Sequence, residues 1–123
     1  MTKRSRLSYA DTLAALEKAI AAAGNTTFAV IDQSAAAARV GMTLRPTTLI
    51  LFGNPKGGTP LMDAFPLVAL ELPLKVLVWE ENGSVSVAYP SMSEIAARYH
   101  VTGMDERVAA MDHALDALTN ALT

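Results

Sequence analysis

Cysteine is absent from this sequence, and its absence excludes several kinds of chemistry. The chain can form no disulfide, and it has no thiolate to act as a nucleophile or to hold zinc or an iron–sulfur cluster. The sequence also has no apolar run long enough to span a membrane. The basic residues at its start are not followed by the apolar segment of a signal peptide. We therefore expect a cytoplasmic protein that does not enter the membrane.

Aromatic residues make up only 6% of the chain and charged residues 18%, whereas hydrophobic residues make up 51%. This composition predicts an ordered core of small side chains rather than a disordered chain. A length of 123 residues fits one domain, which we place over residues 1–123. The formal net charge is −2 and the basic residues are scattered, so nucleic-acid binding is not predicted.

Helix and strand signals occur along the whole chain. Ser8 can cap an amphipathic helix that stops at Gly24. Asp105 can cap a long final helix, in which apolar residues recur at steps of three and four. The other predicted segments are strands at Thr26–Ile31 and Thr48–Phe52 and short helices at Ala35–Val40 and up to Tyr99. We expect the strand at 48–52 to be covered on both faces, because it is apolar throughout.

Asn82-Gly83 predicts a hairpin between Leu74–Glu81 and Ser84–Tyr89, because a type I′ turn needs positive φ at both central residues. This turn places Val78 opposite Val87. The hairpin face expected to join the core consists of Val76, Val78, Val85, Val87 and Tyr89.

The opposite face of the hairpin carries Leu77 and Trp79 among polar residues. A large aromatic side chain on a half-polar sheet face indicates a surface that is covered. We expect a second copy of the chain to cover it, with Leu77 and Trp79 at a homodimer interface.

A glycine-rich segment follows the strand at 48–52 and is the one place where the sequence suggests a site. It runs from Gly53 to Gly58 and leads to a helix that we expect to begin at Thr59-Pro60. Free backbone N–H groups at such a helix start, with a lysine nearby, could hold a phosphate or carboxylate. The candidate ligand-binding residues are Gly53, Asn54, Lys56, Gly58 and Thr59. A tight structural turn explains the same glycines without a ligand.

The segment is not a nucleotide-binding P-loop, although Gly53 and Gly58 have the right separation. Thr59 stands where that motif requires lysine, and Pro60 stands where it requires serine or threonine. The only two histidines, His100 and His113, have no partner at metal-ligand spacing. We therefore predict no metal, cofactor or catalytic residue.

The eight residues from Gly53 to Pro60, GNPKGGTP, resemble the GNPxxGTP signature of the domain of unknown function 302 family. The resemblance extends over about residues 8–100. Gln33 departs from the family pattern, in which histidine often stands at that position. The resemblance implies an α+β fold in which an antiparallel sheet packs against a long C-terminal helix (TBP-like topology), usually as a dimer. It implies no activity.

Three functions remain open from the sequence. The first is a dimeric, non-enzymatic binding protein for a small anionic or polar ligand at the glycine-rich segment. The second is an enzyme acting on a small anionic substrate, with Lys56 or His100 as the proton-transfer group. The third is a structural or protein-interaction module that uses the face of Trp79.

Overall fold

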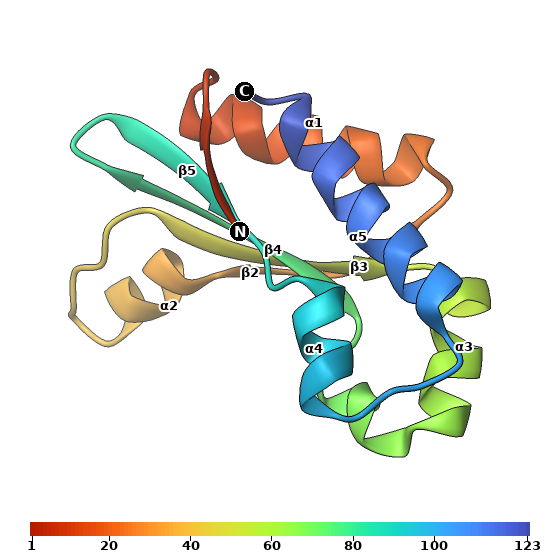
Figure 1. Ribbon diagram of the computed structural model, residues 1–123. Coiled ribbons are helices and arrows are strands. Elements are labelled where there is room, and N and C mark those ends of the chain that lie inside the picture. The colour runs from red at the N-terminus through yellow and green to blue at the C-terminus, as the bar shows by residue number, and fades with distance from the viewer.

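A five-stranded antiparallel sheet with the order β1-β5-β4-β3-β2 forms the centre of the computed structural model, which describes residues 1–123 (Figure 1). The strands are β1 (Thr2–Ser5), β2 (Thr26–Asp32), β3 (Thr47–Gly53), β4 (Leu74–Glu81) and β5 (Ser84–Ala88). The helices are α1 (Tyr9–Ala22), α2 (Gln33–Arg39), α3 (Pro55–Ala64), α4 (Met92–Arg98) and α5 (Asp105–Asn120), with a 3-10 turn η1 (Pro66–Leu70). The fold is therefore α+β, as predicted.

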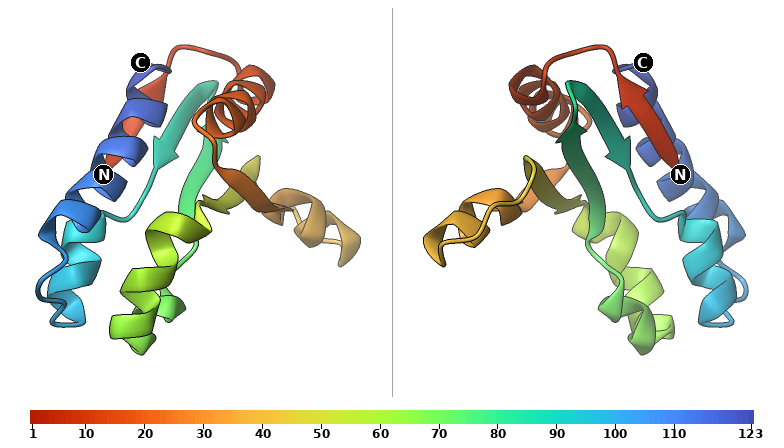
Figure 2. Two further views of the ribbon diagram at one scale, coloured as in Figure 1. Left: turned by 90° about the vertical axis from the view of Figure 1, so that its right-hand side faces the viewer. Right: turned by 90° about the vertical axis from the view of Figure 1, so that its left-hand side faces the viewer.

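Helices α1 and α5 both lie over the same face of the sheet, whereas α2 projects from the rest of the molecule (Figures 1 and 2). Helices α3 and α2 lie at opposite ends of the sheet. A cluster of 17 buried apolar residues fills the space between the sheet and the helices. No helix is both long and apolar enough to cross a membrane.

The hairpin of β4 and β5 has the predicted register. Val78 lies opposite Val87, and Glu81 lies opposite Ser84. Asn82 and Gly83 have φ values of 52° and 81°, so both central residues of the turn are in the left-handed region. All five apolar residues predicted for the core face of the hairpin are buried.

Strand β3 is covered on one face only, so the prediction of cover on both faces was wrong. Ile50 and Phe52 are fully buried, whereas Leu49 and Leu51 on the other face are half-buried. The uncovered face also carries Leu77 and Trp79 of β4, which pair with Ala88 and Ser86 of β5. An apolar strand predicts burial, but the number of helix layers depends on the whole topology.

Helix α3 begins at Pro55, whereas the sequence predicted Thr59 as the N-cap and Pro60 as the first helical residue. Asn54 is its N-cap, because its side chain accepts a hydrogen bond from the Lys56 N–H at 3.0 Å. Pro55 occupies the first helical position, the role that the sequence suggested for Pro60. Pro60 instead lies inside the helix.

Helix α5 has no side-chain cap, so the cap predicted at Asp105 was wrong. Its N-cap is Met104, and Asp105 is its first helical residue. The N-cap of α4 is Ser91, and the Asp112 carboxylate, in the middle of α5, adds to this cap: it accepts hydrogen bonds from the backbone N–H of Met92 at 2.6 Å and of Ser93 at 3.1 Å. This link fixes α4 against α5.

Both ends of the chain are held in the fold. The N-terminal amine of Met1 donates to the Tyr89 carbonyl at 3.0 Å, and the Arg6 N–H donates to the Leu122 carbonyl at 2.8 Å. The Lys3 ammonium donates to the Asp116 carboxylate at 2.7 Å. Strand β1 is therefore tied to both β5 and α5.

Candidate functional site

A crevice of about 1000 Å³ opens at the end of the sheet where α3 begins. One wall is the start of α3, and the opposite wall is the N-terminal half of α5. The start of β2, the end of β3 and the segment that leads into β4 complete it. Its size lies at the upper end of the range of about 300–1000 Å³ found for small-molecule sites.

Four of the five predicted ligand-binding residues line this crevice: Gly53, Asn54, Gly58 and Thr59. Lys56 is not among the lining residues. His100, the other predicted proton-transfer group, lies two residues after the end of α4 and does not line the crevice either. The two groups suggested for an enzyme therefore do not meet at this site.

The amides at the start of α3 do not face outward unpaired, so that part of the prediction was wrong. The Lys56 N–H donates to the Asn54 side chain. The N–H groups of Gly57 and Gly58 both donate to the Asn54 carbonyl, at 2.9 and 3.1 Å. A ligand in the crevice therefore cannot rely on these backbone donors.

Gly57 and Gly58 lie inside the helix without a conformational reason to be glycine. Neither has a positive φ, and a β-carbon on Gly58 would have its nearest neighbour, the Met62 methyl, at 3.6 Å. A glycine inside a helix destabilises the folded state by about 0.5–1 kcal/mol relative to alanine. Since the fold does not require these glycines, they leave open space on the α3 wall of the crevice.

Methionine side chains form much of the apolar surface of the crevice. Met62, Met104 and Met111 all line it, which is three of the six methionines in the chain. Met111 belongs to the predicted apolar stripe of α5, but it is only half-buried because it faces the crevice. Methionine adapts to irregular shapes, so this wall can adjust to an apolar ligand.

Arg107 is the only basic residue on the wall of the crevice. Its guanidinium donates from Nη1 to the backbone carbonyls of Lys56 at 3.3 Å and Gly57 at 3.4 Å. The Lys56 carbonyl needs such a donor, because Pro60, four residues on, has no N–H to complete the helical hydrogen bond. Arg107 thus supplies a donor to the one carbonyl in the first turn of α3 that Pro60 leaves without a helical partner.

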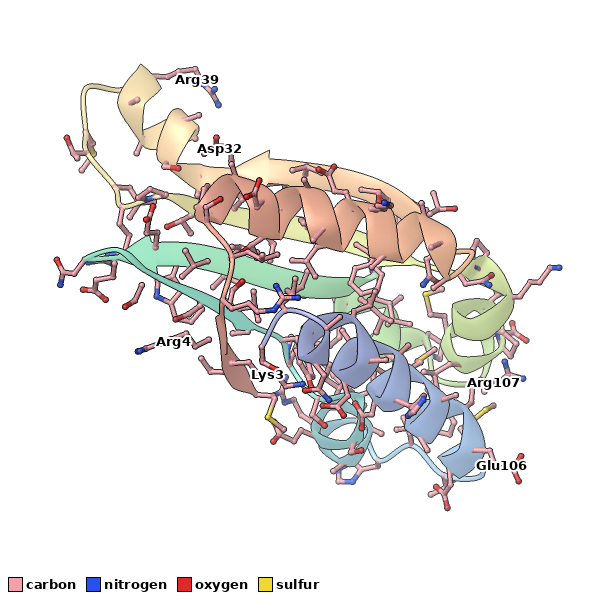
Figure 3. All side chains as sticks on the ribbon, turned by 90° about the horizontal axis from the view of Figure 1, so that it is seen from above. Lys3, Arg4, Asp32, Arg39, Glu106 and Arg107 are labelled. Atoms are coloured by element: carbon pink, nitrogen blue, oxygen red, sulfur yellow. The ribbon has the colours of Figure 1, made fainter.

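The charged residues of the crevice are Asp105, Glu106 and Arg107, all in the first turn of α5. Figure 3 shows Glu106 and Arg107 at the end of α5 that lies near α3. Arg107 takes part in none of the three ion pairs of the structure, so its charge has no carboxylate partner. Arg107 could not be predicted from the sequence, because only the three-dimensional fold brings it next to the glycine-rich segment.

The groups with displaced pKa values lie away from the crevice. Hydrogen bonds from Ser34 and the Ala35 N–H lower the pKa of Asp32, and a hydrogen bond to Glu71 raises the pKa of Tyr99. Burial alone would lower the pKa of Lys3, but its hydrogen bond to Asp116 and its position beside Tyr89 raise it, and Lys3 lowers the pKa of Asp116. No three acidic or histidine side chains converge closely enough to hold a metal ion.

Comparison with known proteins gives a family but no activity. The family model described as "Domain of unknown function DUF302" matches residues 1–122. A crystal structure of an uncharacterized conserved protein DUF302 from Bacillus stearothermophilus matches 100% of this chain and 97% of that chain, with a TM-score of 0.91 and 18% sequence identity. That likeness shows the fold.

Some curated relatives are longer proteins. The fluoride-specific ion channel FluC 1 of Brucella suis biovar 1 (strain 1330) is 36% identical over 110 residues, which are 89% of this chain and 43% of the relative. FluC 2 of Brucella melitensis biotype 1 has the same identity over 40% of its length. The chain therefore spans about two-fifths of the curated relatives that it matches.

Proposed function

The chain belongs to the DUF302 family, and from this premise we propose that it is a cytoplasmic, non-enzymatic, homodimeric binding protein. Its ligand is a small molecule with an apolar body and an anionic or polar head group. The single observation that carries this proposal is the crevice of about 1000 Å³ between α3 and α5.

The apolar body of the ligand would lie against the methionines of the crevice and the bare backbone at Gly57 and Gly58. The absence of side chains at these two positions supports the proposal, because helical glycines that the fold does not need allow a ligand to reach the main chain. We propose that the ligand makes van der Waals contacts, and no hydrogen bonds to free amides, with four lining residues: Gly53, Asn54, Gly58 and Thr59.

The head group would lie at the first turn of α5. Arg107 is the one cation there and lacks a carboxylate partner. Its planar guanidinium can bind a carboxylate through two parallel hydrogen bonds. Asp105 and Glu106 are stabilised in that turn by the helix dipole, so they do not need Arg107. We therefore expect an anionic head group to bind more tightly than a cationic one.

Three probes of equal chain length test this proposal: decanoate, decanol and decylamine. Titration followed by NMR should shift the amide signals of Gly57, Gly58 and Met111, with decanoate bound about tenfold more tightly than decylamine. Replacing Arg107 by Met should remove the preference for decanoate over decanol. The proposal is overturned if none of the three probes shifts these signals.

A matched pair of variants on α5 tests whether the probes bind in the crevice. Ala110 lines the crevice, whereas Ala117 is exposed on the same helix two turns further on and does not line it. Ala110→Leu should fill the crevice and weaken probe binding, and Ala117→Leu should leave binding unchanged. Equal effects of the two variants would place the probes elsewhere.

The homodimer in this proposal is supported by apolar surface that the monomer leaves uncovered. Leu77 and Trp79, the predicted interface residues, lie on the sheet face that no helix covers, beside the half-buried Leu49. Sedimentation equilibrium at micromolar concentration should give twice the monomer mass. A monomer would remove this part of the proposal.

A second candidate function follows from the relatives named fluoride-specific ion channels. The similarity covers 89% of this chain, which has no helix able to cross a membrane. As this second candidate, we propose that the segment matching this chain is a separate domain attached to the channel, and that this domain binds fluoride. A titration with sodium fluoride should then shift amide signals that sodium chloride leaves unchanged, and identical responses to the two salts would contradict it.

A further inference from the structure

Strand β2 is an edge of the sheet that is interrupted by a register shift between Thr27 and Ala29 but carries, over residues 26–31, neither the charged residues nor the proline that usually prevent pairing with another chain. Six of its seven residues are exposed. Phe28, Val30 and Ile31 keep 53%, 46% and 37% of their surface accessible. Residues 26–31 contain no charge and no proline, and the first charge is Asp32 at the end of the strand. Natural edge strands normally avoid such an apolar row, because it offers unpaired backbone groups to another strand.

The opposite edge of the sheet, β1, is protected. It has only four residues, and two of them are Lys3 and Arg4. Short length and basic side chains are common means of preventing edge-to-edge association. Of the two edges of the sheet, β2 is therefore the one that offers an uncharged apolar strand to a partner.

We propose that β2 of one copy pairs antiparallel with β2 of a second copy around a two-fold axis. Two identical strands related in this way satisfy the backbone donors and acceptors of both, and the pairing closes without leaving another open β2 edge. The proposal goes beyond the function proposed above, because it locates the contact between copies. It places that contact at β2 in preference to the open face of Leu77 and Trp79, and the variants described below decide between the two surfaces.

The exposed apolar area is close to what a stable dimer needs. A second group of exposed apolar residues lies just beyond β2: Val40, Met42 and Leu44 are 39% to 73% exposed. If a large apolar side chain has about 200 Å² of surface, these three residues together with Phe28, Val30 and Ile31 expose about 600 Å² per copy. Stable interfaces bury about 800 Å² per partner, and the main chain of β2 can supply the remainder.

Antiparallel pairing of the two β2 strands also determines which part of the second copy lies beside each crevice. Asn25 and Phe28, at the start of β2, line the crevice, and α2 follows the end of β2. In an antiparallel pair, the end of one strand lies beside the start of the other. Helix α2 and residues 40–46 of the second copy therefore lie next to the crevice of the first. Only this consequence rests on the proposed ligand binding.

The first test is the mass of the full chain and its variants in solution by sedimentation equilibrium. We expect 26.0 kDa, twice the 13.0 kDa of one chain. Val30→Lys should weaken the dimer by about tenfold or more, since it places like charges across the two-fold axis. Leu70→Lys is the matched control, because Leu70 is 72% exposed on η1, and it should remain a dimer. A monomeric wild-type protein overturns the proposal.

A further variant, Ser86→Lys, distinguishes a contact between copies at the β2 edge from a contact on the open face of the sheet. Ser86 lies opposite Trp79 on that face and is half-buried. Ser86→Lys should leave the dimer intact if the copies meet at β2. If Ser86→Lys is a monomer while Val30→Lys remains a dimer, the contact is on the open face and the proposal is wrong.

Single cysteines provide a measurement that does not depend on a lysine variant folding well. The chain has no cysteine of its own, so one introduced thiol is unambiguous. Substituting Phe28, Ala29 and Val30 by Cys in turn should give a disulfide-linked dimer at one position at least, since facing residues of paired strands lie within bonding range. Leu70→Cys should stay unlinked. Failure at all three positions contradicts the pairing even if the probes still bind the crevice.

Discussion

The guanidinium of Arg107 donates a hydrogen bond to the backbone carbonyl of Lys56 at 3.3 Å, and so joins the first turn of α5 to the first turn of α3. Pro60 leaves that carbonyl without a helical donor, and Arg107 supplies one in its place. Two helices that are distant in the sequence thus share a hydrogen bond at the rim of the candidate binding crevice.

A double-mutant cycle tests this relationship. Arg107→Gln should lower the free energy of unfolding by about 0.5–1.5 kcal/mol, because the Lys56 carbonyl loses its donor. The same substitution should cost less in a Pro60→Ala background, where the N–H of residue 60 can complete the helix. Urea unfolding of the four proteins measures the coupling. Equal costs in both backgrounds would show that Pro60 does not create the need for Arg107.

Gly58→Ala should affect stability and binding in opposite directions. The new methyl group meets only ordinary contacts, the closest at 3.6 Å, so the free energy of unfolding should rise by about 0.5–1 kcal/mol. The same methyl group enters the crevice and should weaken decanoate binding. Thermal unfolding and NMR titration on one sample measure both. A destabilised variant would show that the fold itself requires this glycine.

Asp112 should contribute to stability through α4, although it belongs to α5. Asp112→Ala removes the acceptor of the Met92 and Ser93 N–H groups and should cost about 1–2 kcal/mol. Asp63→Ala is the control, because Asp63 is exposed and makes no side-chain hydrogen bond. Hydrogen exchange should show faster exchange in α4 for the first variant only.

The pair of Lys3 and Asp116 predicts loss of stability in acid. The hydrogen bond from Lys3 holds the pKa of Asp116 below its ordinary value of 3.8. A group with a lowered pKa in the folded state contributes stability above its unfolded pKa, and that stability is lost as the pH falls through the folded pKa. Lys3→Met should therefore reduce the change in unfolding free energy between about pH 5 and pH 2.

Arg4→Met is the control for this pH dependence. Arg4 is exposed on the same strand and forms none of the ion pairs of the structure. Its replacement should leave the slope of stability against pH as in the wild-type protein. If Lys3→Met and Arg4→Met change the slope equally, general charge removal and not the Asp116 contact is responsible.

Local signals predicted much of the fold. The Asn82-Gly83 turn fixed the register of β4 and β5, since turn type and register depend on a few adjacent residues. Ser8 caps α1 as predicted, with its side chain accepting from the Asp11 N–H at 3.1 Å. The GNPKGGTP segment also indicated the position of the crevice, because it joins a central strand to a helix.

The incorrect predictions concern features of the structure that depend on residues far apart in the sequence. Gly57 and Gly58 have poor helix propensity, so the start of α3 was predicted too late; Asn54, Pro55 and the contact from Arg107 stabilise a helix there. Asp112 adds to the cap of a helix about 20 residues earlier, and no local pattern reveals that. The single helix layer over β3 likewise follows from the order of all five strands.

The attachment of β1 to the rest of the fold has a consequence for any shortened form of this chain. Removing the first five residues would take away Lys3 and Arg4 and leave the longer β5 without its neighbour. The sheet would then have an unprotected edge strand, β5 or β2, at each of its two edges. Molecules of that kind can add to one another at either side without limit, so we expect the shortened protein to polymerise into filaments instead of stopping at pairs.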